Sequence, residues 1–554
     1  MPDTPRGSEN GRETWRVFNL QVGLREPESR LRERALAAVG LAPEAVRGFR
    51  IAHRSLDARR RGASRELHFV VHVDLVIDAG GVTAALGRAQ KAGRAKLLAP
   101  PGTLHGVRLH PSLRGARVAV VGAGPAGLFA AFVLAESGVS VDLLDRGRSL
   151  GERGRAIAAF ARGRVLDPEN NLLYGEGGAG TYSDGKLYTR VDHELEAPIL
   201  DVLVACGAPP EVRYDARAHI GTDRLHRVLP ALRRRLEQGG VRFHWGVRVD
   251  GLRIEDAATR RVAALRTEAG EVACDAVIFA PGHSARETLR IIQQQGVAVE
   301  AKPFQFGVRI EHPQAQIDRA RHGEGPDAQL LGPAYYNLSS RAGGGASAAH
   351  SFCMCPGGQI VASVNEPGLL CTNGMSNSRH SSPYANAALV VTLGPKDFGS
   401  GTFAGTAFQR KMERRFFEAG GGDYTAPAQR ACDFLAGRAS QSSEIGPSSY
   451  KFGVRAARID ELLPPEVRDA LRRALGHFDR AIPGFAGPEG LLVGVESRSS
   501  GPLRIPRCGV TRRATGFGNL YPVGEGAGYA GGIMSAAIDG ASSARALLEL
   551  GIAR

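Results

Sequence analysis

A run of closely spaced glycines points to binding of a phosphate-containing cofactor. In Gly122-Ala123-Gly124-Pro125-Ala126-Gly127, the first glycine suits a tight turn, the second lets the backbone approach a pyrophosphate, and the third lets a helix pack closely on a strand. A helix that begins after the second glycine would present free N–H groups and a partial positive charge to the phosphates. We therefore expect a bound dinucleotide to contact Gly122, Gly124, Pro125, Ala126 and Gly127.

The segments around this run are those that a dinucleotide-binding unit needs. A short apolar strand precedes the glycines, an Ala-rich helix follows them, and a second apolar strand covers residues 139–144. Asp145 closes that strand at the position where a carboxylate accepts hydrogen bonds from the ribose hydroxyls of the nucleotide. Because an acid there disfavours a 2′-phosphate, we expect NAD or FAD rather than NADP, and we place the adjacent Arg146 in the same site.

Two further runs match the same glycine spacing in a different context. Gly175 to Gly180 follows no buried strand and continues into a loop that ends at Lys186. Gly526 to Gly531 follows an apolar strand and precedes a long apolar helix, but no second strand comes after it. Neither run is therefore expected to form an independent nucleotide-binding unit.

The arrangement of these runs resembles the glutathione-reductase-like class of FAD-binding flavoproteins. In that class the chain returns twice to the dinucleotide fold. Asp275 to Gly282 is similar to the first return, with proline where threonine is usual, and Val523 to Glu525 is similar to the second, with glutamate in place of aspartate. The resemblance implies that this carboxylate holds a ribityl hydroxyl and that the following helix directs its N-terminus at the flavin ring. It adds these FAD-binding residues: Ala280, Pro281, Gly282, Gly524, Glu525, Gly531, Gly532 and Ile533.

Longer segments resemble a large bacterial family of NAD- or FAD-utilising dehydrogenases. The segments that carry this resemblance are Asn171–Leu187, Phe304–Pro313, Phe352–Gly358, Asn373–Ser376 and Val495–Ser500, with Ser55–Arg59 near the N-terminus. The similarity extends over nearly the whole chain. It implies the fold and the FAD, and it says little about the substrate.

The same resemblance implies FAD contacts in two more places. The loop that contains Gly177, Gly178 and Lys186 would run along the cofactor, and the lysine would offset the charge of the pyrophosphate or of the reduced flavin. A surface loop whose lysine reaches into solvent is the alternative. Val249 would offer a backbone contact to the adenine, unless its strand only packs in the core.

Four residues are candidates for chemistry on the substrate. His283, which follows the turn at Gly282, could act as a general acid or base, or it could simply cap that turn. Arg309, Glu496 and Arg498 could anchor an anionic substrate or could form a structural network of ion pairs. Arg309 and Glu311 lie on one face of an alternating strand and could pair with each other.

The seven cysteines show no zinc-site or disulfide-framework spacing, and we expect no metal site. This odd and scattered set favours a reducing compartment, and the polar first residues contain no signal peptide, so we expect a cytoplasmic protein. Cys353 and Cys355 lack the spacing of flavin disulfide reductases, and we expect structural or pocket-lining thiols there. The uncharged stretch 118–135 is broken by glycines, which argues against a membrane span.

Periodicity predicts an α/β protein built around a Rossmann-type FAD-binding domain. Alternating apolar residues and short helices at the N-terminal end predict a ferredoxin-like α+β domain. The predicted division is a flexible N-terminus at 1–14, the ferredoxin-like domain at 15–100, a linker at 101–114, the FAD-binding domain at 115–300 and 490–554, and an inserted α+β substrate domain at 301–489.

The leading hypothesis is an FAD-dependent oxidoreductase that passes a hydride between a small organic substrate and non-covalently bound FAD. No second complete dinucleotide-binding unit is visible, so NAD(P)H would dock transiently, or quinone, oxygen or a carrier protein would exchange the electrons. The net charge of +15 and the basic loop at 54–61 keep an RNA-associated or RNA-modifying flavoprotein as an alternative. A non-catalytic FAD redox sensor is a third hypothesis.

Overall fold

The computed structural model describes residues 11–58, 60–61, 64–65, 67–78, 82–189, 192–256, 259–341 and 347–552. Contacts between residues divide the chain into two compact units. Unit 1 comprises 1–102, 209–218 and 321–332, and unit 2 comprises 103–208, 219–320 and 333–554. Most of the expected flexible N-terminus, residues 1–10, lies outside the described residues, and a strand begins at Arg12.

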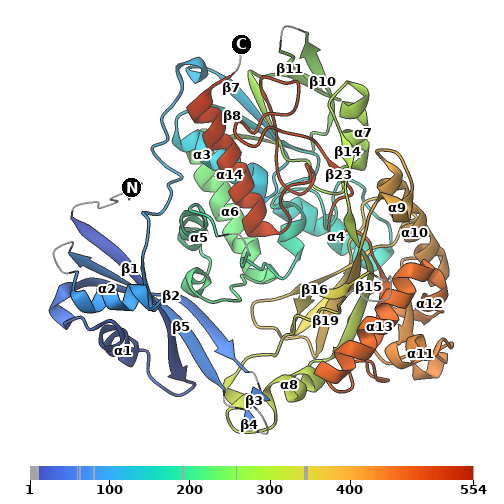
Figure 1. Cartoon of the computed structure of the whole chain (residues 1–554). Coiled ribbons are helices and arrows are strands. Elements are labelled where there is room, and N and C mark those ends of the chain that lie inside the picture. The colour runs from blue at the N-terminus through green and yellow to red at the C-terminus, as the bar shows by residue number, and fades with distance from the viewer. Residues whose placement is uncertain are drawn as a thin grey trace. The chain divides into compact units, whose positions relative to one another are not determined.

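Unit 1 is built on one antiparallel sheet. Its main elements are β1 (Arg12–Gly23), α1 (Ser29–Val39), β2 (Val46–Asp57), β5 (His68–Asp78), α2 (Ala84–Lys91) and β6 (Ala95–Leu97), with β3 (Arg60–Arg61), β4 (Ser64–Arg65) and the 3-10 helices η1 (Pro43–Ala45), η5 (Pro210–Arg213) and η6 (Ala328–Leu330). The strand order is β2-β5-β1-β6, and every neighbouring pair is antiparallel (Figure 1). The alternating Val71, Val73, Leu75 and Ile77 of β5 are buried in its core.

The basic segment 54–61 was expected to form a loop. Its first residues instead belong to strand β2. Arg54 forms ion pairs with Glu28 at 3.2 Å and with Asp215 at 3.7 Å. The latter contact helps to explain why residues 209–218 belong to unit 1. Arg59 lies outside the described residues. The arginine that opens the loop is therefore committed to carboxylates of its own unit.

Unit 2 contains a five-stranded parallel sheet made from distant parts of the chain. Its strands are β7 (Arg117–Val121), β8 (Ser140–Asp145), β9 (Arg242–Trp245), β13 (Ala276–Phe279) and β24 (Leu520–Pro522). They lie in the order β9-β8-β7-β13-β24, which is the 3-2-1-4-5 order of Rossmann-like dinucleotide folds. Because β13 and most of β7 and β8 are buried, these strands are apolar runs without alternation.

Helices and an antiparallel meander complete this part of unit 2. Helix α3 (Pro125–Glu136) lies beside α14 (Ile533–Leu550), as Figure 1 shows. The other elements here are α4 (Leu150–Gly163), α5 (Glu196–Ala205), α6 (Thr222–Gln238), α7 (Arg286–Gln294), β10 (Val249–Glu255), β11 (Arg261–Thr267), β12 (Gly270–Ala273), η3 (Pro111–Leu113) and η4 (Gly178–Tyr182). No helix in the described part of the chain is both long enough and apolar enough to span a membrane.

A second sheet of unit 2 has six strands. They are β15 (Phe304–Pro313), β16 (Ala349–Cys355), β19 (Tyr384–Leu393), β20 (Ala426–Arg430), β21 (Val454–Ala456) and β22 (Leu491–Glu496), in the order β16-β19-β15-β22-β20-β21. Helices α10 (Ala404–Gly420) and α13 (Pro465–Ala481) pack against it. The remaining elements are β14 (Glu300–Ala301), β17 (Gly358–Ala362), β18 (Thr372–Ser376), β23 (Leu503–Arg504), α8 (Gln314–His322), α9 (Pro395–Phe398), α11 (Ala431–Ala436), α12 (Ile459–Leu462) and η7 (Ser442–Glu444).

Candidate functional site

The turn between β7 and α3 leaves open space at the N-terminus of the helix. Gly122 has φ +101°, and a Cβ there would overlap the carbonyl oxygen of Ala280, so this position requires glycine. Gly124 has φ −75° and ψ 178°, and a Cβ there would meet no atom within 4 Å. The backbone at Gly124 is therefore exposed to any ligand at the helix N-terminus, where unpaired N–H groups attract phosphate.

The side chain of Asp145 links three turns next to the N-terminus of α3. Its buried carboxylate accepts hydrogen bonds from the backbone N–H groups of Ala123 at 2.7 Å, Gly147 at 2.8 Å and Gly175 at 2.9 Å. Burial raises the pKa of Asp145, and these three donors favour the ionised form. A carboxylate offers about four lone-pair sites, so the contact that the sequence predicts, to a ribose hydroxyl, has room for one further donor.

Arg153 is a residue of this site that sequence reasoning missed. Its fully buried guanidinium donates to the carbonyl oxygens of Asn171 at 2.7 Å, Glu176 at 2.8 Å and Gly178 at 2.9 Å. Burial lowers its pKa to about 10, so the group remains a cation at neutral pH. It holds the second glycine-rich loop in place beside the first. Its position in the polar sequence of α4 gave no signal that distinguishes it from the exposed residues of that helix.

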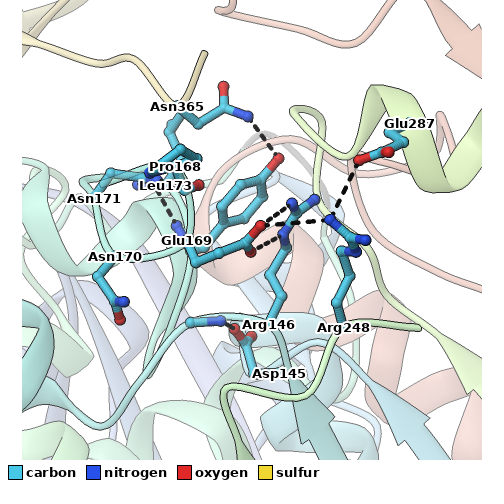
Figure 2. A network of polar contacts seen from close by, with 12 residues as sticks. Asp145, Arg146, Pro168, Glu169, Asn170, Asn171, Leu173, Arg248, Glu287 and Asn365 are labelled. Atoms are coloured by element: carbon cyan, nitrogen blue, oxygen red, sulfur yellow. Dashed lines mark hydrogen bonds and ion pairs between the residues drawn. The ribbon is translucent and has the colours of Figure 1, made fainter. Parts of the chain in front are cut away.

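Arg146, the residue after Asp145, belongs to a network of charged side chains that Figure 2 shows. Arg146 forms a two-pronged ion pair with Glu169, with N···O distances of 2.5 and 2.6 Å, and stacks on the ring of Tyr174 at 4.4 Å. Arg248 approaches Glu169 at 3.8 Å and Glu287 at 3.7 Å. Arg146 is therefore committed to a carboxylate of this network.

The ring of Tyr174 links two turns of the site. Its hydroxyl donates a 2.6 Å hydrogen bond to the carbonyl oxygen of Ser284 and accepts a 2.9 Å hydrogen bond from Asn365. Burial raises the pKa of Tyr174 to about 12, which keeps the hydroxyl protonated. Both partners lose their hydrogen bond if the hydroxyl is removed.

We expect Tyr174→Phe to lower the free energy of unfolding by about 1–3 kcal/mol, because it leaves two buried polar partners unsatisfied. Urea denaturation monitored by circular dichroism measures the change. The matched control is Tyr384→Phe at a half-buried tyrosine, which should change stability by less than about 0.5 kcal/mol. Equal stability of Tyr174→Phe and the unmodified protein would contradict the structural role of the hydroxyl.

The structure brings the glycine-rich segments side by side. The N–H of Gly177 donates to the carbonyl of Ala123 at 2.9 Å. A Cβ on Gly180 would lie 3.1 Å from Ile533, the first residue of α14. A Cβ on Gly526 would overlap the carbonyl of Gly282. Four separate segments of the chain therefore adjoin one another around the turn that leads into α3.

The turns after β13 and β24 adjoin through their backbones. The N–H of Ala280 donates to Val121 at 2.8 Å, and the N–H of Val523 donates to Phe279 at 2.9 Å. Pro281 and Gly282 follow, and Gly524 donates its N–H to the buried Asp539 at 2.8 Å. The expected residues of both returns are thus adjacent in space.

Glu525 lies against the start of α14. Its carboxylate accepts a 2.8 Å hydrogen bond from the N–H of Gly501 and lies 3.6 Å from the ammonium of Lys302. Burial raises the pKa of Glu525, and the lysine opposes that rise. A Cβ on Gly531 would overlap this carboxylate, so a side chain at that position would displace the Glu525 oxygen. At Gly532 itself a Cβ would meet no atom within 4 Å.

Val249 and Lys186 occupy different surroundings. Val249 opens strand β10 and is buried, and Val247 beside it donates its N–H to the carbonyl of Asp145 at 2.9 Å. Lys186 instead directs its ammonium at Asp184, at 3.0 Å, and at the thiols of Cys353 and Cys355, at 3.7 Å each. The sequence leaves open the alternative that this lysine reaches into solvent. The contacts instead enclose its ammonium within the protein.

The expected anionic-substrate anchors lie in buried ion pairs. Arg309 pairs with Glu496 at 2.7 Å, and not with Glu311, whose carboxylate accepts a hydrogen bond from the N–H of Ser449 at 3.0 Å. The two residues share a strand, but the tertiary fold supplies each with a partner from elsewhere in the chain.

Arg498 belongs to a second buried network. Arg498 and Arg286 both pair with Glu413, at 2.7 and 2.8 Å. Both guanidinium groups lower the pKa of Glu413 well below its usual range, against the effect of burial. His283 lies close to this network. Burial, then Arg498 and Arg286, lower its pKa to about 4, so its ring is neutral at neutral pH.

Comparisons with known proteins match the chain to flavoprotein families. Residues 120–175 match the family model of an NAD(P)-binding Rossmann-like domain. Residues 209–328 match an FAD dependent oxidoreductase, and residues 303–499 match the C-terminal domain-like part of an FAD-dependent protein. Residues 15–76 match a domain of unknown function.

A relative from a bacterium and two solved structures are also similar to the chain. An uncharacterised protein of Clostridium beijerinckii is 38% identical over 436 residues, which cover 78% of this chain and 81% of that protein. Glycine oxidase from Bacillus cereus is 12% identical over 79% of this chain and 97% of its own, with a TM-score of 0.31. L-amino acid deaminase from Proteus vulgaris is 13% identical over 82% and 95%, with a TM-score of 0.30.

The residues around Gly124 fit the cofactor that the matched families bind. An open glycine, the N-terminus of α3 and the carboxylate of Asp145 lie together, and two further glycine-rich segments adjoin them. The extensive identity with the clostridial relative and the matches to FAD-dependent families agree with this geometry. The chain belongs to a family of FAD-dependent flavoproteins, and it is an FAD-dependent oxidoreductase.

Proposed function

We propose that this oxidoreductase passes a hydride between a small organic substrate and non-covalently held FAD. The observation that carries the proposal is the meeting of separate glycine-rich segments at the open position of Gly124. When bound, FAD supplies the capacity to take up or release a hydride. The chain's own residues bind the cofactor, orient it and exclude water.

The segments around Gly124 supply the proposed binding residues for the pyrophosphate, the ribose and the adenine of FAD. The N–H groups at the start of α3, after Gly124, and those of Gly177 and Gly178 would face the pyrophosphate. Asp145 would accept from the adenosine ribose, and the backbone at Val249 would meet the adenine. Adjacent to them are Gly122, Pro125, Ala126, Gly127 and Arg146.

The opposite end of the cofactor would lie at the start of α14. Glu525 would hold a ribityl hydroxyl, and Gly531, Gly532 and Ile533 would present the helix N-terminus to the pyrimidine side of the ring, where negative charge is stabilised. The turn Ala280, Pro281 and Gly282 would line the same end, together with Gly524.

Among the catalytic candidates we favour His283 as the group that contacts the substrate. Arg309, Glu496 and Arg498 are engaged in buried ion pairs, so we propose that they support the walls of the pocket. The neutral ring of His283 can accept a hydrogen bond or a proton from a substrate hydroxyl or amine.

Several finer features belong to the same proposal. The strand order of the parallel sheet supports the glutathione-reductase-like class, and the β-α-β-β-α-β order of unit 1 supports a ferredoxin-like domain. We also propose a cytoplasmic location. The electrons would be exchanged with transiently docked NAD(P)H, or with quinone, oxygen or a carrier protein.

Anaerobic reduction of the purified holoprotein tests this function. NADH, NADPH and a panel of amines, amino acids and hydroxy acids are each mixed with the protein, and the flavin absorbance is followed. We expect one compound to bleach the flavin rapidly, and His283→Asn to slow that bleaching by about 100- to 10,000-fold, the usual contribution of a general acid or base. A flavin that no compound reduces, although dithionite does, would contradict the enzymatic proposal.

A further inference from the structure

Two cysteines lie within a cluster of charges in unit 2. Cys353 and Cys355 end strand β16, Lys186 follows the second glycine-rich loop, and Arg309 lies in strand β15. We call these four residues the thiol cluster. All seven cysteines of the chain are free, so both sulfurs of the cluster are available as thiols or thiolates.

Two cations contact the sulfurs directly. The ammonium of Lys186 lies 3.7 Å from both Sγ atoms. The guanidinium of Arg309 lies 3.8 Å from Sγ of Cys355 and donates a 2.9 Å hydrogen bond to the carbonyl of Cys353. Neighbouring Lys and Arg side chains are the surroundings that stabilise a thiolate over a thiol.

The backbone holds the two cysteines in different positions. Cys353 has φ +47°, a left-handed conformation that is uncommon for a residue with a side chain, and the pairing of β16 with β19 is irregular between Phe352 and Cys355. Cys353 is half-buried, whereas Cys355 is fully buried. The irregularity therefore separates a half-buried cysteine from a fully buried one.

Two carboxylates oppose the cations. Asp184 lies 3.0 Å from Lys186, and Glu496 lies 2.7 Å from Arg309. Burial raises the pKa of Glu496, and Asp184 disfavours ionisation of both cysteines. The effects that favour ionisation prevail at one sulfur: the interaction with Cys355, then Lys186 and Arg309, lower the pKa of Cys353 against the effect of burial. The same coupling raises the pKa of Cys355 well above its usual range.

We propose that Cys353, the half-buried thiol of the pair, is a nucleophilic thiolate with Lys186 as its counter-ion, and that this site captures disulfides. The Cys353 sulfur attacks one sulfur of the disulfide. A new S–S bond forms between Cys353 and that sulfur, and the original S–S bond breaks. The second sulfur leaves with the electron pair of the broken bond, as a thiolate that water protonates. The exchange needs no electron donor, so it does not rest on the proposed flavin reaction.

The test measures thiol–disulfide exchange with 4,4′-dithiodipyridine on the holoprotein. The protein carries Cys508→Ser, because Cys508 is exposed and hydrogen bonds from the 510–511 turn lower its pKa to about 7, so it would react as well. Release of thiopyridone is followed from pH 5 to pH 9, and mass spectrometry identifies the modified cysteine. We expect a rapid phase of one equivalent at Cys353, with a midpoint well below about 8.5, the value of an ordinary thiol.

Lys186→Met removes one counter-ion. We expect it to raise the pH midpoint of the rapid phase by about one unit, the effect of losing about 1.4 kcal/mol of stabilisation of the thiolate. Lys451→Met, at an exposed lysine, is the matched control and should leave the rate unchanged. The proposal is overturned if Cys353 reacts no faster than the half-buried Cys432, or if its midpoint is that of an ordinary thiol. Both outcomes are read on the protein with native Lys186, so the test stands even if the variant fails to fold.

Discussion

Replacing Gly124 by valine should give a protein that folds normally and no longer retains FAD. The backbone at Gly124 has φ −75° and ψ 178°, a conformation that valine adopts readily. A Cβ at this position would meet no protein atom within 4 Å, so the added side chain costs the fold little. It would instead fill the space before the N-terminus of α3, where the pyrophosphate would lie.

We expect Gly124→Val to weaken FAD binding by more than about 100-fold, equivalent to about 2.8 kcal/mol. Titration of deflavinated protein with FAD, followed by flavin fluorescence, measures the affinity. Gly151→Val is the matched control, because a Cβ at Gly151 also meets no atom within 4 Å but lies on α4, outside the proposed site. Retention of FAD by Gly124→Val would show that the cofactor does not approach this turn.

Replacing Glu413 by glutamine should destabilise the protein by about 3–5 kcal/mol, the cost of breaking a buried ion pair on one side. Glu413 is fully buried and pairs with both Arg286 and Arg498. Glutamine keeps the volume but removes the charge, which leaves two buried cations with the part-exposed Glu366 as their remaining carboxylate. Urea denaturation of the deflavinated protein measures the loss without a contribution from bound cofactor.

The pH dependence of this loss has a definite sign. Because both arginines lower the pKa of Glu413 in the folded protein, its contribution is complete above the pKa of the unfolded chain, about 4.3. It is lost as the pH falls toward the folded pKa. The stability difference from Glu413→Gln should therefore be constant at neutral pH and shrink below about pH 4.

Glu366→Gln provides the matched control for Glu413. Glu366 also pairs with Arg286, at 2.9 Å, but its side chain is 24% exposed, so its removal should cost about 1 kcal/mol or less. Equal losses for the two variants would mean that burial does not set the strength of this network.

The parallel sheet and its glycine turns could be predicted because their signals are local. The apolar runs of β7 and β8, the spacing of Gly122, Gly124 and Gly127, and the acid at Asp145 all lie within one short segment. Each residue acts on its immediate neighbours, so spacing alone carries the information.

The exact partners of the buried charges could not be predicted in this way. The sequence leaves both Glu311 and an ion-pair network with Glu496 open for Arg309. It gives no sign that Arg286 meets Glu413 from a distant helix. Arg153 is fully buried in a helix whose sequence is as polar as an exposed one. Only the tertiary fold brings such groups together, and a single sequence gives no measure of which charges are buried.

The boundaries of the compact units could not be predicted from the sequence either. Residues 209–218 and 321–332, which we placed in the FAD-binding and inserted domains, belong by contact to unit 1. The hydrogen bond from the N–H of Arg54 to the carbonyl of Tyr214, at 2.7 Å, is one such contact. A contact of this kind produces no periodic pattern of apolar residues in the sequence of either segment.

A crystal structure of the purified holoprotein with its FAD tests the proposed position of the cofactor directly. We expect the pyrophosphate within hydrogen-bonding distance of the N–H groups that follow Gly124, and the flavin ring at Gly531 to Ile533. An FAD that lies elsewhere, with the turn at Gly124 in contact with solvent, would contradict it.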